Sequence, residues 1–287
     1  MNTPTMAMQA CIENSNSTLF LVDAYGVLYT GSGPVPGAAE FMRYLQSRGH
    51  VYVLTNNSYL YPHYIVEKLA HESDIHLETS QIISSGHGLA FDATISSLIQ
   101  SKTVFYMGSD YGIDYLKDAK PKAITNTLND AELIVMGAYR HAEHQAYHEA
   151  LKTLLSEKPD VDLVCCNPDR VVSGGDGKLY TVVGHYAAEL QAFMTKPILW
   201  FGKPHHNFSN LVKSRLSHLE HDISQALFFD DNMHNVIQLS KDLNCQGVWV
   251  ADTGIHVNQQ DQAKALLGGS NIVSIKHFNK DAVLKSY

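Results

Sequence analysis

Short apolar runs separated by amphipathic stretches recur along the first part of this 287-residue chain. Leu19–Val22, Val51–Leu54 and Ile82–Ser84 each have the length and composition of a buried strand. The stretches between them, Ala38–Arg48 and Tyr61–His71, have apolar residues at helical spacing. Strands that alternate with helices predict βαβ units and a parallel sheet.

The middle of the chain has an alternation of its own. Thr103–Met107, Leu133–Met136 and Leu163–Cys166 are predicted strands, and His144–Leu155 is a predicted helix. A cluster of turn residues at Ser173–Gly177 indicates a hairpin. This part of the chain therefore has the pattern of a separate module.

The last part returns to the first pattern. Ile198–Phe201, Ala226–Phe229, Gly247–Val250 and Ile272–Ile275 are further predicted strands. A pattern that stops, gives way to another and then resumes predicts one domain inserted into another.

The predicted fold class is therefore α/β, with a doubly wound parallel-sheet core and an inserted α/β domain. The core strands are expected near residues 19, 51, 82, 198, 226 and 248. The expected boundaries are a flexible N-terminal arm at 1–17, a core at 18–85 and 184–287, and an inserted domain at 86–183.

Composition narrows the possible partners. Hydrophobic residues make up 45% of the chain and charged residues 17%, which is typical of a globular protein. The formal charge of −8 disfavours binding to nucleic acid or to an anionic membrane, because both require a basic surface. The four cysteines form no CxxC pair, and the N-terminus lacks the features of a secretory signal, so we expect a cytoplasmic protein.

Chemically useful side chains follow the predicted strands at the points where these end. They are Asp23, Thr55, Lys203 and the pair Asp230 and Asp231. The carboxyl ends of parallel strands open on one edge of a sheet, so these groups can converge. Asp23 could attack phosphorus, and Asp23 with Asp231 could hold Mg²⁺. Thr55 and Lys203 could then bind the phosphoryl oxygens.

Each of these residues also has an ordinary structural interpretation. Asp23 could cap a turn, Thr55 could form a local hydrogen bond after its strand, and Lys203 could be a solvated side chain. Adjacent acids such as Asp230 and Asp231 are more informative, because they repel one another unless something binds them. The prediction depends on the order, spacing and strand context of the whole set.

With these motifs the chain resembles the haloacid dehalogenase superfamily of phosphatases. Within it, the chain is similar to the class IIA branch, in which a large α/β cap lies between the second and third motifs. The matching segments are Asp23–Leu28, Val51–Asn57, Phe201–Pro204 and Phe228–Asn235, with Asn167–Asp169 and Gly184 as matching cap features. The resemblance implies a magnesium-dependent phosphatase that acts on a small phosphorylated metabolite, and it suggests a homodimer.

The resemblance also implies roles for single residues. Asp23 would be the nucleophile, and its side chain, that of Asp231 and the carbonyl of Tyr25 would be Mg²⁺ ligands. Asp230 would be a direct or a water-mediated ligand, and Asn235 stands where many relatives have another acid.

Phosphate and substrate contacts are implied in the same way. Thr55, Asn56, Asn57 and Lys203 would bind phosphate. Asn167, Asp169 and Arg170 are the candidate cap contacts to the rest of the substrate.

Tyr25 departs from the family pattern. Relatives have a second acid here, which protonates the leaving group and then activates water. Such catalysis is typically worth about 10²–10⁴-fold in rate, and a phenol with a pKa near 10 is a poor base at neutral pH. We therefore expect slow or substrate-restricted hydrolysis. An alternative interpretation is that Tyr25 simply covers the site or contacts the cap.

Two other functions are compatible with the motifs. Asp-Ala-Tyr-Gly at 23–26 also resembles the first motif of 2-haloacid dehalogenases. Their chemistry needs no metal, whereas Asp230 and Asp231 are metal-type ligands, and their cap lies elsewhere in the chain. Without the second acid the protein could instead bind a phosphorylated metabolite and not turn it over.

Overall fold

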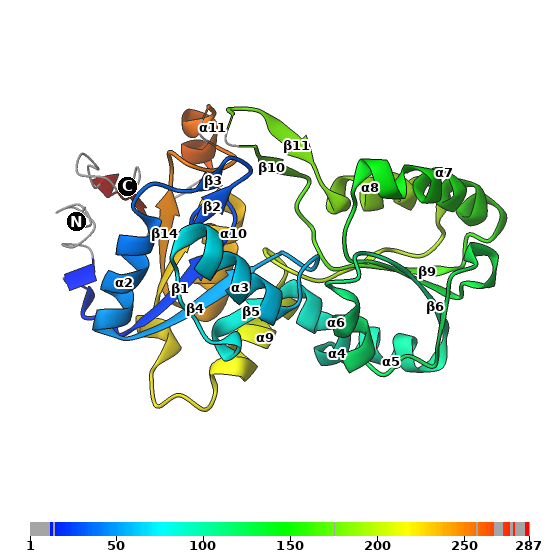
Figure 1. Ribbon diagram of the computed structural model, residues 1–287, viewed down its shortest axis with the longest axis horizontal. Helices are drawn as coiled ribbons and strands as arrows, with labels where there is room; N and C mark the ends of the chain where they lie inside the picture. The colour runs from blue at the N-terminus through cyan, green and yellow to red at the C-terminus, as the bar shows by residue number, and fades with distance from the viewer. Residues whose placement is uncertain are drawn as a thin grey trace.

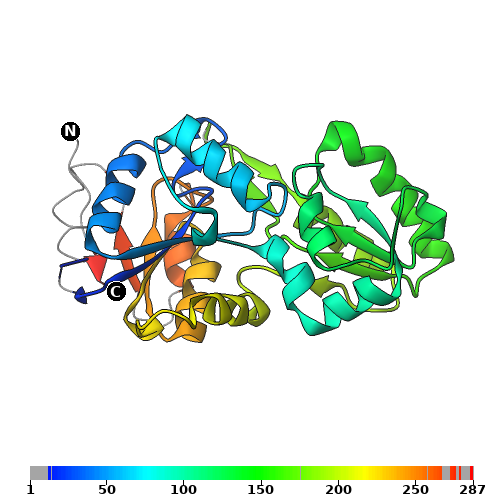
Figure 2. The same cartoon turned by 60° about the horizontal axis from the view of Figure 1, so that its bottom comes forward.

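The chain folds into two α/β units that lie end to end, each built around its own sheet (Figures 1 and 2). This is a computed structural model, and it describes residues 12–13, 15–174, 176–256, 258–266, 272–275, 278 and 285–286. We call the larger sheet and its helices the core unit. We call the elements from α5 (Ala93–Ser101) to β12 (Leu199–Trp200) the inserted unit.

The core sheet has seven strands in the order β16-β15-β14-β13-β1-β4-β5. They are β1 (Leu19–Asp23), β4 (His50–Thr55), β5 (Ile82–Ser84), β13 (Leu227–Asp230), β14 (Gln246–Val250), β15 (Ile272–Ile275) and β16 (Lys285–Ser286). All neighbours pair in parallel except β15 and β16. The predicted parallel core sheet is confirmed, because the apolar runs of the sequence form its central strands.

Helices cover both faces of this sheet. Successive side chains of β1 point to opposite faces, so Phe20 and Val22 join one buried cluster and Leu19 and Leu21 join another. Helices α2 (Ala38–Arg48) and α3 (Pro62–Ser73) pack in the first cluster, and α9 (His206–Leu216) and α10 (Met233–Leu243) pack in the second. The core is therefore doubly wound, as predicted.

The inserted unit has a five-stranded parallel sheet in the order β12-β9-β8-β6-β7. Its strands are β6 (Thr103–Met107), β7 (Ala123–Thr125), β8 (Leu133–Met136), β9 (Asp162–Cys165) and β12. Its longer helices are α5, α6 (Ile113–Asp118), α7 (His141–Glu157) and α8 (Val183–Leu190). The hairpin predicted near Ser173–Gly177 is the antiparallel pair β10 (Val171–Ser173) and β11 (Leu179–Thr181).

The remaining elements are short. They are β2 (Tyr29–Thr30), β3 (Gly33–Pro34), α4 (Gly88–Phe91), α11 (Gln260–Ala265) and the 3₁₀ turns η1 (Thr79–Gln81), η2 (Ser85–His87), η3 (Leu128–Asp130), η4 (Gln191–Phe193) and η5 (Ile223–Gln225). In Figure 1 the β10–β11 hairpin extends from the inserted unit towards α11 of the core unit.

The strand expected near residue 198 was assigned to the wrong sheet. β12 pairs with β9 of the inserted unit, where Leu199 is opposite Val164 and Trp200 is opposite Cys165. The predicted boundary between residues 183 and 184 falls inside α8, whose Ala187 packs in the apolar cluster of the inserted unit. A two-residue strand that belongs to a neighbouring sheet looks the same in sequence as a core strand, and this is why the prediction failed.

The N-terminal arm predicted at 1–17 lies mostly outside the described residues. Of its described residues, Ile12 is fully buried in the core unit and Ser17 is buried next to β1. No helix in the described part of the chain combines the length and apolarity needed to cross a membrane. The cytoplasmic location and the homodimer stay predictions.

Candidate active site

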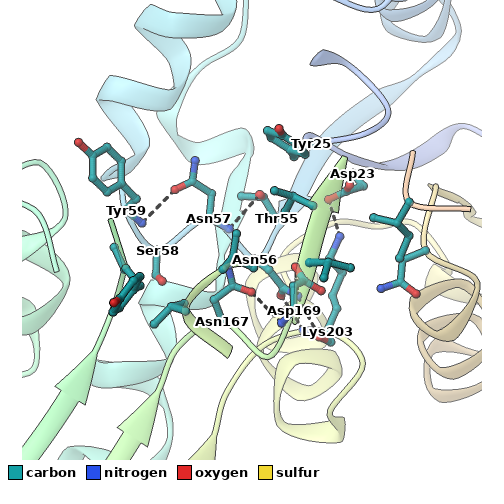
Figure 3. A pocket seen from close by; sticks show the side chains of 18 of the residues that line it. Asp23, Tyr25, Thr55, Asn56, Asn57, Ser58, Tyr59, Asn167, Asp169 and Lys203 are labelled. Atoms are coloured by element: carbon teal, nitrogen blue, oxygen red, sulfur yellow. Dashed lines mark hydrogen bonds and ion pairs between the residues drawn. The ribbon is translucent and has the colours of Figure 1, made fainter. Parts of the chain in front are cut away.

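Three adjacent strands of the core sheet end at the candidate site. β1 lies between β13 and β4, so Asp23, Thr55 and Asp230, with Asp231 directly after it, meet at one edge. Lys203 reaches the same point from the loop that follows β12 (Figure 3). The structure thus brings together all the strand-end groups that the sequence analysis selected.

Lys203 is the centre of this arrangement. Its Nζ donates hydrogen bonds to Asp23 Oδ1 at 2.5 Å, to Asp230 Oδ2 at 2.6 Å and to the Leu54 carbonyl at 3.0 Å. The side chain is only 1% exposed. Burial lowers the pKa of Lys203, but the charges of the two carboxylates outweigh it and raise the pKa above its usual value. Lys203 is therefore a buried, fixed positive charge.

A third carboxylate, that of Asp231, lies beside the two that contact Lys203. Oxygen atoms of Asp23, Asp230 and Asp231 all lie within 4.8 Å of one another. Burial raises the pKa of Asp23, and the neighbouring acids add to this, although Lys203 opposes it. Burial and the charge of Asp230 raise the pKa of Asp231 to about 8. The excess of buried negative charge favours binding of a cation.

The surrounding atoms fit a hard divalent ion. The amide oxygen of Asn235 is buried and has no hydrogen-bond partner among the described residues. The Nδ2 of Asn235 donates to Asp230 Oδ1 at 3.3 Å, which places the amide beside the acids. Mg²⁺ prefers oxygen ligands of this kind and usually keeps several waters. The residues present therefore suit Mg²⁺, and Asp23 and Asp231 are the ones best placed to hold it.

The turn after β1 is shaped around Asp231. Gly26 has a φ of 94°, and a Cβ added there would lie 2.5 Å from Asp231 Cγ. Its amide donates to the Tyr29 carbonyl at 2.7 Å and closes the turn. Only glycine combines this left-handed conformation with so close an approach to a carboxylate.

The residues expected to bind phosphate, Thr55 to Asn57, lie at and just after the end of β4 and form hydrogen bonds with the rest of the site. Thr55 Oγ1 accepts a hydrogen bond from the Asn57 amide at 3.1 Å. The Asn56 side chain accepts from the Lys203 amide at 2.8 Å, and it donates to the Lys203 carbonyl at 2.9 Å and to Asp169 Oδ2 at 3.0 Å. Asn57 Oδ1 accepts from the Tyr59 amide at 2.9 Å. The side chain of Asn56 thus holds the Lys203 loop. The Asn57 backbone is engaged on both sides, because its carbonyl also accepts from the Ser84 hydroxyl at 2.7 Å.

The inserted unit supplies the opposite wall of the cavity. Asn167 and Asp169 line it, and burial raises the pKa of Asp169 to about 6. Arg170, expected as a third contact, does not line it. Its guanidinium donates to the Gly184 carbonyl at 2.9 Å and stacks over Trp200 at 5.3 Å.

The sequence analysis missed most of the remaining lining. The cavity has a volume of about 380 Å³ and its walls include Tyr59, Ala138, Tyr139, Arg140, Val171, Val172, Val182, Val183 and Ile255. Ala138 to Arg140 follow β8 after Gly137, so the end of this strand was a usable signal. The valines of β10 and those at the start of α8 carry no such signal.

Tyr25 contacts the inserted unit. Its hydroxyl donates to the Ser173 carbonyl of β10 at 2.8 Å, and its ring packs edge-on against Tyr29 with 5.4 Å between ring centroids. Burial raises the pKa of Tyr25 above its usual value. The contact agrees with the packing interpretation of this residue.

Comparisons with known proteins agree with this geometry. Residues 20–121 match a family model described as haloacid dehalogenase-like hydrolase. Acid sugar phosphatases of Staphylococcus haemolyticus and Staphylococcus epidermidis are 28% and 29% identical over 186 and 188 residues. Each alignment covers 62% of this chain, and 67% and 68% of the respective relative.

Solved structures show the same fold. A possible sugar phosphatase of the HAD superfamily from Cytophaga hutchinsonii aligns with a TM-score of 0.75 at 16% identity, over 93% of this chain and 95% of that one. A glycerol phosphate phosphatase from Mycobacterium tuberculosis, solved with magnesium, aligns with a TM-score of 0.67 at 16% identity, over 88% and 71%. The fold, the site and the partial family match agree in their resemblance to haloacid dehalogenase-like hydrolases. The predicted resemblance to phosphatases of this class is confirmed.

Proposed function

We propose that this protein is a magnesium-dependent phosphatase of small phosphomonoesters that works through a phosphorylated Asp23. One observation carries the proposal. Three buried carboxylates at the ends of adjacent strands lie around one buried lysine, and Asp23, Asp231 and Lys203 line a cavity that the inserted unit covers.

The residues of this chain would have the following roles in the reaction. Asp23 attacks phosphorus, and the bond from phosphorus to the ester oxygen breaks. Thr55 and the Asn56 amide hold phosphoryl oxygens, and Lys203 neutralises their charge. Asp23, Asp231 and the Tyr25 carbonyl hold Mg²⁺, which when bound supplies further charge neutralisation.

Asp230 has a supporting role in this proposal. Its Oδ2 already receives the Lys203 ammonium at 2.6 Å, and its Oδ1 receives the Asn232 amide at 2.8 Å. Both oxygens are therefore occupied, which favours contact with the ion through water over direct ligation.

Hydrolysis of the phosphorylated Asp23 completes the catalytic cycle, and we expect it to be the slow step. Water attacks phosphorus and must lose a proton, but the Tyr25 hydroxyl donates to the Ser173 carbonyl and has a raised pKa. Tyr25 is thus a poor base, and we expect phosphorylated enzyme to accumulate during turnover.

Sugar phosphates are the first substrates to test, because the curated relatives are named acid sugar phosphatases. Asn167 and Asp169 would contact the part of the substrate beyond the phosphate, and Arg170 would not. The test is phosphate release from a panel of phosphometabolites with and without Mg²⁺. The matched control is Asp23→Asn, which keeps the shape of the side chain and removes the nucleophilic oxygen anion.

Magnesium-dependent release that Asp23→Asn abolishes would support the proposal. Tight, magnesium-dependent binding of a phosphorylated ligand without any product would refute it, and it would favour the non-catalytic alternative that the loss of the second acid left open.

A further inference from the structure

The inserted unit contributes one carboxylate to the cavity, that of Asp169. The other two lining carboxylates, Asp23 and Asp231, are the nucleophile and a metal ligand in the proposed function. Among the described residues no histidine lines the cavity, and the Tyr25 hydroxyl donates to the Ser173 carbonyl at 2.8 Å. Asp169 is therefore the one lining carboxylate that the proposed reaction leaves without a chemical step.

One oxygen of Asp169 is held in place and the other is open. Oδ2 accepts from Asn56 Nδ2 at 3.0 Å (Figure 3), whereas Oδ1 accepts no hydrogen bond from the described residues. Within the same set, no hydrogen bond joins Asp169 to the proposed metal ligands Asp23 and Asp231. The Asn56 side chain also accepts from the Lys203 amide at 2.8 Å, and the backbone amide of Asn56 is a proposed phosphate contact. The bond to Asn56 thus holds Asp169 beside the expected position of the phosphoryl group.

Asp169 also lies on the side from which the alcohol must leave. In phosphoryl transfer the attacking and the leaving oxygen are roughly in line across phosphorus. Asp23 attacks from the end of β1, so the ester oxygen points away from the core sheet. The wall opposite that sheet belongs to the inserted unit, and Asp169 is its carboxylate.

The surroundings of Asp169 suit proton transfer near neutral pH. Burial raises the pKa of Asp169 to about 6; the charge of Lys203 and the hydrogen bond from Asn56 oppose this rise, and the charge of Asp230 adds to it. Asp231 also faces Asp169, since each carboxylate raises the cost of ionising the other. A proton donor is most effective when its pKa lies near the pH at which it works.

We infer that Asp169 is a catalytic residue of the proposed reaction and gives its proton to the ester oxygen as the alcohol departs. This inference rests on the proposed function. In this step Asp23 forms a bond to phosphorus, the bond from phosphorus to the ester oxygen breaks, and the carboxyl proton of Asp169 moves to that oxygen. The alcohol leaves neutral, and the Asp169 carboxylate takes a proton from solvent before the next turnover. The role belongs to the first half of the cycle, and hydrolysis of the phosphorylated Asp23 remains the expected slow step.

The acidity of the leaving alcohol decides how much this proton matters. Phenols have a pKa of about 10, whereas alkyl alcohols are far weaker acids, comparable with water at about 15.7. A phenolate departs with little help, but an alkoxide needs the proton. Asp169 should therefore be important for sugar and other alkyl phosphates and have little effect on a phenyl ester.

The experiment measures kcat/KM for cyclohexyl phosphate and phenyl phosphate with the whole chain in Mg²⁺, for wild type and Asp169→Asn. The two esters have similar size, and kcat/KM reports the cycle only up to the departure of the alcohol, so slow hydrolysis does not mask the effect. We expect Asp169→Asn to lower the value for cyclohexyl phosphate by about 10²–10⁴-fold and that for phenyl phosphate by less than about tenfold.

The substitution keeps the link to the core unit, because the asparagine oxygen can still accept from Asn56 Nδ2. Asp130→Asn is the matched control, since it makes the same change at an exposed acid outside the cavity and should leave both values unchanged. An equal loss for both esters in Asp169→Asn would overturn the inference, because Asp169 would then only position the Lys203 loop.

The pH dependence of wild type is a second measurement that needs no variant. Asp169 must be protonated to act, so kcat/KM for cyclohexyl phosphate should fall relative to that for phenyl phosphate as the pH rises through about 6. The ratio largely cancels the ionisation of the phosphate group, whose second pKa is also about 6, and that of the metal ligands, because both esters share them. A ratio that stays constant between about pH 5 and pH 8 would also refute the role of Asp169. If wild type cleaves neither ester, the proposed function itself fails, so the two failures are distinct.

Discussion

Replacing Lys203 by methionine tests how far the carboxylate cluster depends on one buried charge. The substitution keeps an unbranched apolar stem and removes the ammonium group. Lys203 Nζ contacts Asp23 at 2.5 Å and Asp230 at 2.6 Å, and both acids are buried. The variant leaves two buried carboxylates without a compensating charge.

Removing one partner of a buried ion pair costs about 3–5 kcal/mol, because the other charge stays behind. Two carboxylates lose their partner here, but protonation of one limits the total, since its pKa rises further. We therefore expect Lys203→Met to lower the free energy of unfolding by about 3–5 kcal/mol at pH 7 in the presence of a chelator. Mg²⁺ should recover part of this loss, because it binds the same carboxylates.

The assay is urea unfolding followed by circular dichroism, with EDTA and then with Mg²⁺. Lys213→Met on α9 is the matched control, since Lys213 is exposed and should leave the unfolding midpoint unchanged. A Lys203→Met protein as stable as the Lys213→Met control in EDTA would refute the reasoning, because the acids would then not depend on the ammonium.

Three further predictions concern the metal site and the inserted unit. Mg²⁺ at about 100 times its Kd should raise the free energy of unfolding by about 2.7 kcal/mol. Thermal unfolding of Asp231→Asn should show no such stabilisation. An equal stabilisation in that variant would contradict the assignment of Asp231 as a ligand. A Cβ at residue 254 would overlap the Asp231 carboxylate, so Gly254→Ala should weaken Mg²⁺ binding by about 10–100-fold; calorimetric titration that gives an unchanged Kd would rule this out. Burial raises the pKa of Asp162, but hydrogen bonds from Lys102 and Lys196 outweigh it and lower the pKa below its usual value. Asp162→Asn should therefore cost about 1–3 kcal/mol at pH 7, and urea unfolding should show this difference disappearing as the pH falls through the lowered pKa; a difference that persists at pH 2 would contradict the ionic origin.

The residues that meet at the carboxyl ends of the core strands could be predicted from the sequence for a physical reason. Each apolar run is long enough to be a buried strand, and the first polar residue after it lies at the strand's carboxyl end. Parallel pairing then brings Asp23, Thr55 and Asp230 together without any knowledge of side-chain packing. Lys203 could be placed only through its motif, since the strand before it belongs to the other sheet.

The contacts between the two units could not be predicted. Ser173 receives the Tyr25 hydroxyl, and Asp169 receives the Asn56 amide group, across sequence separations of 148 and 113 residues. Both depend on where the inserted unit lies relative to the core sheet. Hydrophobic periodicity describes how each unit packs internally and contains no information on this relative position, which is also why Arg170 was expected in the cavity.

The contacts between the units also explain why one substitution affects two properties at once. Besides the Tyr25 hydroxyl, the hairpin of the inserted unit receives the Ser32 hydroxyl, which donates to the Gly174 carbonyl at 3.0 Å. The resemblance implies an acid at the position of Tyr25, whereas this position here donates to the hairpin. A side chain whose only proton is engaged in that contact cannot also serve a leaving group. Introducing an acid at residue 25 should therefore raise the rate of phosphate release and also loosen the hairpin, so turnover and unfolding must be measured on the same variant.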